Sequence, residues 1–354
     1  MNAEVRNTEK RSTARSAVLP RVAIALGDPA GIGPEIALKA ALDPAVRAMC
    51  HPVLFGDRRA LEAHARCCGM SVRIESITNA RDAEIKSDAV ALVHRDQFTG
   101  SPLRIGQLAA AHGQSALDSA RAAISAALAG EVEAVVAAPQ TESAIKLAGI
   151  EFDGYPTFVA RCTGTPAEDA FLMLCFDREG RETRIVHTTL HVSVRRALDL
   201  VTQPRVEHVI RAADAALRRI GIASPRIAVA GLNPHASESG LFGDEEQHII
   251  EPAIAAVKAS GIDAAGPFGA DTMLYMSGYD AFIVMYHDQG HIAAKALARN
   301  RTAGLTIGTP VLFSSVAHGS ALDIAGMNQA DSSAMVEAIR RLVGGPTPKM
   351  MNAE

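Results

Sequence analysis

The stretch that decides the fold is residues 21–42, which read RVAIALGDPAGIGPEIALKAAL. An apolar run is followed by a turn rich in glycine and proline, and then by a segment whose apolar residues have helical spacing. This order recurs along the chain, and most of the runs are apolar throughout, as in strands buried on both faces of a parallel sheet. The pattern predicts an α/β fold with parallel sheets. The expected strands lie within 21–26, 52–56, 89–93, 133–138, 170–176, 183–189, 226–232 and 281–286. Helices are expected over 115–130, 206–221 and 245–261.

The composition narrows the class of protein. The length of 354 residues fits two domains of ordinary size. The composition, 48% hydrophobic and 21% charged, is close to the average of folded globular proteins. A net charge of −4 and 4% aromatic residues argue against nucleic-acid binding, and no apolar run is long enough to span a membrane. The five cysteines contain no CxxC pair, so we expect reduced thiols and a cytoplasmic location. Residues 1–20 and 346–354 are expected to be disordered tails.

Three histidines each follow an expected strand. His191 follows the run at 183–189, His235 the run at 226–232 and His287 the run at 281–286. The carboxyl ends of parallel strands line the ligand crevice of an open sheet, and neutral imidazole is a common ligand of divalent metals. The pattern predicts a metal site, although three unrelated polar loop residues would give the same sequence. His187 falls within a strand pattern and His291 is expected to begin a helix, so neither is expected to be a ligand.

Two loops are candidate ligand-binding segments. The turn at 27–33 lacks GxGxxG spacing and the Walker lysine, so we interpret it as a substrate-side loop through Gly31, with a simple tight turn as the alternative. Residues 318–326 read HGSALDIAG, and their small side chains would allow a flat ring to approach the backbone. This segment resembles the adenosine-binding loop of isopropylmalate and isocitrate dehydrogenases, although a plain loop is the alternative. The predicted cofactor-binding residues are His318, Gly319, Ser320, Ala321 and Asp323.

Five segments taken together resemble the 4-hydroxythreonine-4-phosphate dehydrogenase family: 27–35, 231–246, 266–272, 286–291 and 318–326. The resemblance implies an isocitrate/isopropylmalate dehydrogenase-like fold, with two α/β/α domains around an active-site cleft. It implies a first domain at 21–140 plus 300–345 and a second at 141–299. It also implies a homodimer, with a metal site shared between subunits as an open possibility, NAD or NADP as cofactor, and one divalent metal per subunit. The metal would be Zn, Co, Mn, Fe or Mg, held by the three histidines.

The resemblance also implies roles for charged residues. Lys295 matches a substrate-side lysine of the family, so it is a candidate base, as is Asp288 beside the last metal ligand. Asp271 is expected to orient the metal site.

Three substrate positions depart from the phosphate-binding pattern of that family. Tyr155 stands within its GHT segment, Gly304 replaces an asparagine and Phe313 replaces an arginine. Because arginine is the strongest phosphate-binding side chain, these changes put a phosphorylated substrate in doubt. They resemble a branch acting on terephthalate dihydrodiol, which implies oxidation with decarboxylation to protocatechuate. A dehydrogenase for a phosphorylated hydroxy acid or amino acid, and a non-catalytic ligand-binding α/β protein, are the alternatives.

Overall fold

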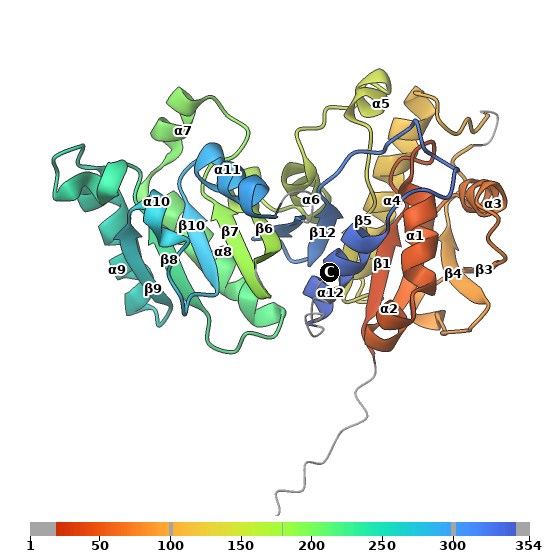
Figure 1. The fold of residues 1–354 in the computed structure, drawn as a ribbon, viewed down its shortest axis with the longest axis horizontal. Coiled ribbons are helices and arrows are strands. Elements are labelled where there is room, and N and C mark those ends of the chain that lie inside the picture. Colours follow the sequence, from red (N-terminus) through yellow and green to blue (C-terminus); the bar gives the residue numbers. More distant parts are fainter. Residues whose placement is uncertain (1–18, 99–101, 179, 299–301, 345–354) are drawn as a thin grey trace, which may run out of the picture.

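The computed structural model describes residues 19–98, 102–178, 180–298 and 302–344, and the predicted tails lie almost entirely outside these ranges. The described residues form one mixed sheet flanked by helices (Figure 1), so the α/β prediction is confirmed. Its strand order is β3-β4-β2-β1-β5-β12-β11-β6-β7-β10-β8-β9. The strands are β1 (Arg21–Ala25), β2 (His51–Gly56), β3 (Arg73–Ile77), β4 (Ala89–His94), β5 (Ala134–Ala137), β6 (Phe171–Arg178), β7 (Arg181–His187), β8 (Arg226–Ala230), β9 (Asp263–Phe268), β10 (Ala281–Val284), β11 (Ala303–Ile307) and β12 (Phe313–Val316).

The helices surround this sheet, and the predicted helices are present with shifted ends. The structure has α1 (Gly33–Leu42), α2 (Pro44–Met49), α3 (Arg58–Cys67), α4 (Ala110–Leu128), α5 (Glu142–Leu147), α6 (Tyr155–Thr163), α7 (Val194–Leu200), α8 (Gln203–Arg219), α9 (Glu251–Ala259), α10 (Ala270–Met273), α11 (His287–Ala298) and α12 (Ser333–Val343). Among the described residues, no helix combines the length and apolar character needed to cross a bilayer. The start of α11 at His287 corrects the expectation that a helix begins at His291.

The expectation of purely parallel sheets is wrong at the centre of the molecule. β6 runs antiparallel to β7 and to β11, and β11 runs antiparallel to β12. Only two residues separate β6 from β7, and parallel neighbours would need a crossover of a dozen residues or more. Apolar runs buried on both faces do not reveal direction, and so the sequence pattern could not separate these central strands from their parallel neighbours.

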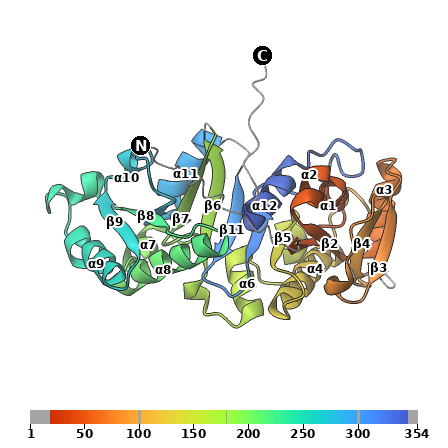
Figure 2. The ribbon, with the colours of Figure 1, turned by 90° about the horizontal axis from the view of Figure 1, so that it is seen from below.

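The end of the chain returns to the first half of the molecule. β12 pairs in parallel with β5, and α12 packs against α1, α2 and β5. Figure 2 shows α12 beside α1 and α2, with β6 to β10 on the other side of β11. Two groups of elements therefore flank the central strands, while the exact domain boundaries stay a prediction.

Successive residues of a strand point to opposite faces of the sheet, and the apolar clusters show which helices pack on each face. α1, α8, α9 and α12 share one apolar cluster, which includes Met173 and Leu305 of the central strands. On the opposite face, α4 and α6 pack in a second cluster with Phe313, and α11 packs in a third with Leu174. Gly304 neighbours Leu305 in β11, so it lies on the α6 and α11 face, as Phe313 does.

Candidate metal and substrate site

His191 and His287 lie together at the carboxyl ends of two paired strands. β7 and β10 are parallel neighbours, His191 follows β7, and His287 begins α11 directly after β10. Their ring centroids are 5.7 Å apart, and both rings line a cavity of about 360 Å³ together with Tyr286. Two imidazoles bound to one zinc ion at about 2.0–2.1 Å would have their centroids roughly 5–6 Å apart. The pair therefore has the spacing of two ligands of one metal ion.

The hydrogen-bond partners of these two rings favour metal binding through the same nitrogen. His287 Nδ1 donates to Asp288 Oδ1 at 2.7 Å, and His191 Nδ1 lies 3.5 Å from the carbonyl oxygen of Asp153. Because an oxygen acceptor holds the proton on Nδ1, the lone pair of each ring is placed on Nε2. Such an acceptor on the far nitrogen is the usual companion of a metal-ligating histidine. The donor set present thus fits a divalent cation.

His235 is presented by a left-handed turn. Five successive residues from His235 to Ser239 have positive φ, between 48° and 70°. Each such non-glycine residue is strained by about 1–2 kcal/mol, and strain of this kind is concentrated at functional sites. The turn is held at its base by buried Glu246, whose Oε1 accepts from the backbone of Leu232 at 2.7 Å and of Asn233 at 2.8 Å. None of these residues is glycine, so the conformation could not be predicted from the sequence.

One chain does not bring the three predicted ligands together. Within the described ranges, no three His, Cys, Asp or Glu residues are grouped closely enough to hold a metal ion. The ring of His235 instead lies 6.3 Å from that of Phe242, in its own loop. A hydrogen bond connects the start of α11, which carries His287, to the loop that carries His235: Gln289 Nε2 donates to the carbonyl of Gly231 at 3.1 Å. The two segments are thus hydrogen-bonded to each other, although the ring of His235 is not grouped with those of His191 and His287.

Two further histidines lie beside His287, and the sequence pattern had assigned neither of them a role. His291 stacks on His287 with centroids 3.8 Å apart and planes 8° apart. Its Nδ1 lies 3.0 Å from Nε2 of His187, the last residue of β7. Burial lowers the pKa of His187 to about 3, and burial together with the neighbouring His287 and Lys295 lowers the pKa of His291 to about 4. The four-residue spacing of His287, His291 and Lys295 on one helix was the signal that could have found His291, whereas no comparable signal marks His187.

The predicted catalytic carboxylates lie in two different places. Asp288 is bonded to His287, so its position suits orientation of that ring. Asp271 is exposed at the start of α10, and a Cβ added at Gly269, two residues earlier, would lie 3.8 Å from the Cα of His235. Lys295 is exposed two helical turns beyond His287, on the face of α11 that carries both histidines.

The predicted cofactor loop and the glycine turn are packed against each other. The Ile32 N–H donates to the Ser320 carbonyl at 2.8 Å, and a Cβ at Gly31 would lie 2.5 Å from that same oxygen. Gly31 thus allows the close approach of the 318–326 loop. His318 is partly exposed and Asp323 is exposed, whereas Ser320 is buried with its hydroxyl unpaired among the described residues.

The far end of this loop is anchored by α1. Buried Glu35 accepts from the Ala330 N–H at 3.0 Å and from Lys39 Nζ at 2.8 Å, and Lys39 also donates to the Ala330 carbonyl. Burial alone would raise the pKa of Glu35, but these donors outweigh it and hold the pKa below its ordinary value. The N-terminal helix and the 318–330 segment therefore form one connected unit.

Tyr155 and Phe313 form an aromatic pair between α6 and β12. Their ring centroids are 4.8 Å apart, and Phe313 is 0% exposed. Burial raises the pKa of the Tyr155 hydroxyl, which has no partner among the described residues. The sequence left open whether these rings line a pocket or pack, and here they pack. Gly304 lies in the adjacent strand, where a Cβ would be 3.2 Å from Leu172.

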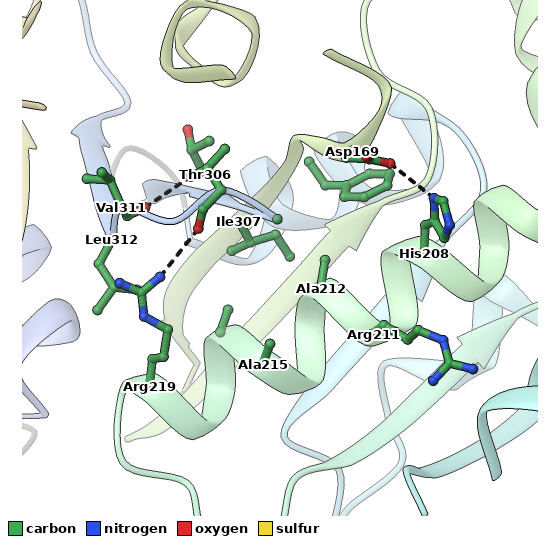
Figure 3. Close-up of a pocket in the computed structure, with 14 residues that line it drawn as sticks. Asp169, His208, Arg211, Ala212, Ala215, Arg219, Thr306, Ile307, Val311 and Leu312 are labelled. Atoms are coloured by element: carbon green, nitrogen blue, oxygen red, sulfur yellow. Dashed lines mark hydrogen bonds and ion pairs between the residues drawn. The ribbon is translucent and has the colours of Figure 1, made fainter. Parts of the chain in front are cut away.

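A separate cavity of about 420 Å³ lies beside α8, against the turn between β11 and β12 (Figure 3). At one end Arg219 donates to the Thr309 carbonyl at 3.4 Å, and at the other His208 is bonded to Asp169 at 3.0 Å. None of the predicted site residues lines it.

Comparison with known proteins gives a consistent class. Residues 48–342 match the family model described as pyridoxal phosphate biosynthetic protein PdxA, so the chain belongs to the PdxA family. A Comamonas sp. protein named 1,2-dihydroxy-3,5-cyclohexadiene-1,4-dicarboxylate dehydrogenase is 41% identical over 92% of this chain and 98% of its own length. These findings confirm the resemblance seen in the sequence.

Solved structures lead to the same family. A terephthalate 1,2-cis-dihydrodiol dehydrogenase from Burkholderia xenovorans LB400 is 41% identical, with a TM-score of 0.72 over 93% of this chain and 100% of that one. A 4-hydroxythreonine-4-phosphate dehydrogenase from Klebsiella pneumoniae is 36% identical, with a TM-score of 0.81 over 92% of this chain and 99% of that one. The chain is accordingly an NAD-dependent dehydrogenase, and the non-catalytic alternative is excluded.

Proposed function

We propose that this dehydrogenase oxidises the cis-dihydrodiol of terephthalate to protocatechuate and CO₂, with a divalent metal and NAD. The observation that carries the proposal is the burial of Phe313 against Tyr155, at positions that match a phosphate-binding arginine and histidine of the family. Two neutral rings offer a phosphate no cation, and burying an unpaired dianion costs several kcal/mol. A flat ring that carries two carboxylates avoids this cost, provided that cations elsewhere meet the carboxylates.

A phosphorylated hydroxy acid or amino acid is the second candidate substrate. It is favoured by the higher TM-score of 0.81 to the Klebsiella pneumoniae enzyme, against 0.72 to the dihydrodiol enzyme. Backbone similarity reports the relative placement of elements, whereas the side chains at Tyr155 and Phe313 decide which anions can be bound. We therefore place more weight on the side chains.

The proposed reaction needs contributions from NAD, from the divalent cation and from side chains of the protein. When bound, NAD would supply the acceptor for the hydride on C2 of the dihydrodiol, and the divalent cation would supply positive charge that stabilises negative charge on the substrate oxygens. The C2 hydroxyl proton passes to a base, which leaves a ketone β to the C1 carboxylate. The C1 carboxylate then leaves as CO₂, and tautomerisation gives the aromatic catechol. Aromatisation makes the sequence strongly downhill.

The chain's own residues have separate tasks in this scheme. His191 and His287 would hold the cation through Nε2, and Asp288 holds His287 in the required orientation. Since Asp288 is already bonded to His287, we assign the role of base or of substrate-carboxylate partner to Lys295. The 318–323 loop would hold the adenosine of NAD, against the support that Gly31 allows.

We further propose a homodimer in which His235 of one subunit completes the metal site of the other. In a single chain His191 and His287 are neighbours, whereas His235 lies apart on a strained turn. A third ligand from a second copy would account for both observations. Catalytic zinc sites have three protein ligands and one position for water or substrate, so two histidines alone would leave the site incomplete.

Subunit complementation tests this arrangement. Neither His235→Ala nor His287→Ala homodimers should turn over the dihydrodiol. Mixed dimers of the two variants should recover activity, because one of their two sites contains all three histidines. If each variant stays inactive after subunit exchange that mass spectrometry has verified, the shared site is wrong.

Product analysis tests the reaction itself. The purified chain with NAD⁺ and the dihydrodiol should release one NADH, one CO₂ and one protocatechuate per turnover. Release of NADH without CO₂ would contradict the decarboxylation, and absence of NADH with this diol would contradict the substrate.

A further inference from the structure

A chain of three imidazoles connects the core of the sheet to His287. His187 is 1% exposed, and its Nδ1 lies 3.4 Å from the carbonyl oxygen of Leu172 in β6. Its Nε2 is 3.0 Å from Nδ1 of His291, and His291 in turn stacks on His287 at 3.8 Å. The chain therefore begins at a main-chain carbonyl and ends at the face of a proposed metal ligand.

The hydrogen-bond partners of His187 and His291 determine which ring nitrogens carry protons. A carbonyl oxygen can only accept, so Nδ1 of His187 carries the hydrogen. A charged imidazole in this buried place would be costly, so His187 is neutral and its Nε2 accepts. His291 Nδ1 must then be the donor across the 3.0 Å contact. The main chain of β6 thus fixes the tautomer and the plane of His291.

The plane of His291 in turn constrains His287. Rings that are 8° from parallel at 3.8 Å are in van der Waals contact over their whole faces. His287 can rotate about its Cβ bond only if His291 moves, and His291 is bonded to the buried ring below it. Asp288 limits the same ring from its Nδ1 edge. The Nε2 of His287 is consequently aimed in one direction.

We propose that His187 and His291 are positioning residues for the metal ligand His287, an inference that rests on the proposed metal site. A metal ligand that is already oriented loses less conformational freedom when the cation binds, so the affinity is higher. His291 acts through the stacked face, and His187 acts by holding His291.

The close packing of Gly290 against His187 is a second, independent observation in support of this arrangement. A Cβ at Gly290 would lie 2.3 Å from Nε2 of His187, the atom that accepts from His291. Any larger residue there would displace the buried ring and break the hydrogen bond. The lack of a side chain at position 290 is thus a requirement of the imidazole chain.

The test measures binding of Co²⁺ alone to the full-length protein, by calorimetry and by the visible absorption of the bound ion. His291→Ala and His187→Leu should weaken binding about 10–100-fold, the usual effect of removing a partner behind a ligand. His291→Phe restores a ring against His287 and should recover most of the affinity. Gly290→Ala should resemble His187→Leu. His208→Ala, on the outer face of α8, should bind as the parent does.

The Co²⁺ spectrum separates positioning from general stability. His291→Ala should shift the absorption bands, because the angle of the His287 ligand changes, and His291→Phe should shift them less. Parent-like affinity and spectra in both His291→Ala and His187→Leu would overturn the inference while leaving the metal site intact. Equal loss of affinity in His291→Phe and His291→Ala would also overturn it. A parent protein that binds no Co²⁺ would overturn both this inference and the proposed metal site.

Discussion

Replacing Phe313 by arginine introduces the side chain that the sequence resemblance implies for phosphate-binding members of the family. Phe313 is 0% exposed and contacts the Tyr155 ring at 4.8 Å. Removing a buried phenylalanine side chain costs about 3–5 kcal/mol, and its aromatic contact accounts for about 0.5–1.5 kcal/mol. A guanidinium that stays buried without a carboxylate adds several kcal/mol. Against a total stability of about 5–15 kcal/mol, the loss is severe.

The matched control is Phe313→Leu, which keeps the position apolar and should cost roughly 2 kcal/mol. Urea unfolding of both variants gives the difference in stability, and NADH absorbance gives kcat/KM for the dihydrodiol. We expect Phe313→Arg to be several kcal/mol less stable than Phe313→Leu and to lose far more turnover. An arginine variant as stable as the parent, with undiminished kcat/KM for the dihydrodiol, would show that the buried ring of Phe313 is not required for stability or for turnover.

Three further predictions concern supporting contacts. Asp288→Asn should weaken Co²⁺ affinity about 10–100-fold in calorimetry, because the carboxylate partner of His287 is lost. Gly31→Ala should raise the KM for NAD in steady-state kinetics, since its Cβ would lie 2.5 Å from the Ser320 oxygen; an unchanged KM would remove the loop from the cofactor site. Glu35→Gln should destabilise the protein at pH 7, where the parent's carboxylate is ionised. Because the folded pKa of Glu35 lies below 4.5, urea melts should show this deficit shrinking as the pH falls from 4.5 through that pKa, and a constant deficit would contradict it.

The sequence predicted the part of the site that depends on strand ends. β8 and β10 are short and mostly apolar, β7 ends in an apolar pair before His187, and His191, His235 and His287 follow these three strands as expected. Position after a strand is a local property, so periodicity and turn residues sufficed to find it.

The sequence pattern could not predict which of these side chains come into contact in the folded protein. The run of positive φ that carries His235 away is formed by non-glycine residues, which give no local signal for it. The stacking of His291 on His287 depends on where α11 begins, one turn earlier than expected. Helix starts are uncertain in sequence, and a shift of one turn decides which residues share a face.

The strands that escaped the pattern have identifiable reasons. β3 and β9 form the two edges of the sheet, and their charged or glycine- and proline-containing sequences are not continuously apolar. β11 and β12 are short and contain glycine or serine, although they occupy the centre. Their burial comes from both flanking strands and helices, which is a property of the assembled fold.

In the proposed function, the aromatic pair of Tyr155 and Phe313 favours the dihydrodiol over a phosphorylated substrate. The most direct measurement is kcat/KM of the unaltered protein for the terephthalate dihydrodiol and for 4-phosphohydroxythreonine, with NAD⁺ and the same metal. We expect turnover of the dihydrodiol with a far higher kcat/KM than that of the phosphorylated compound. A higher kcat/KM for 4-phosphohydroxythreonine would contradict this expectation, because this chain has two neutral rings at the positions where the resemblance implies a phosphate-binding histidine and arginine.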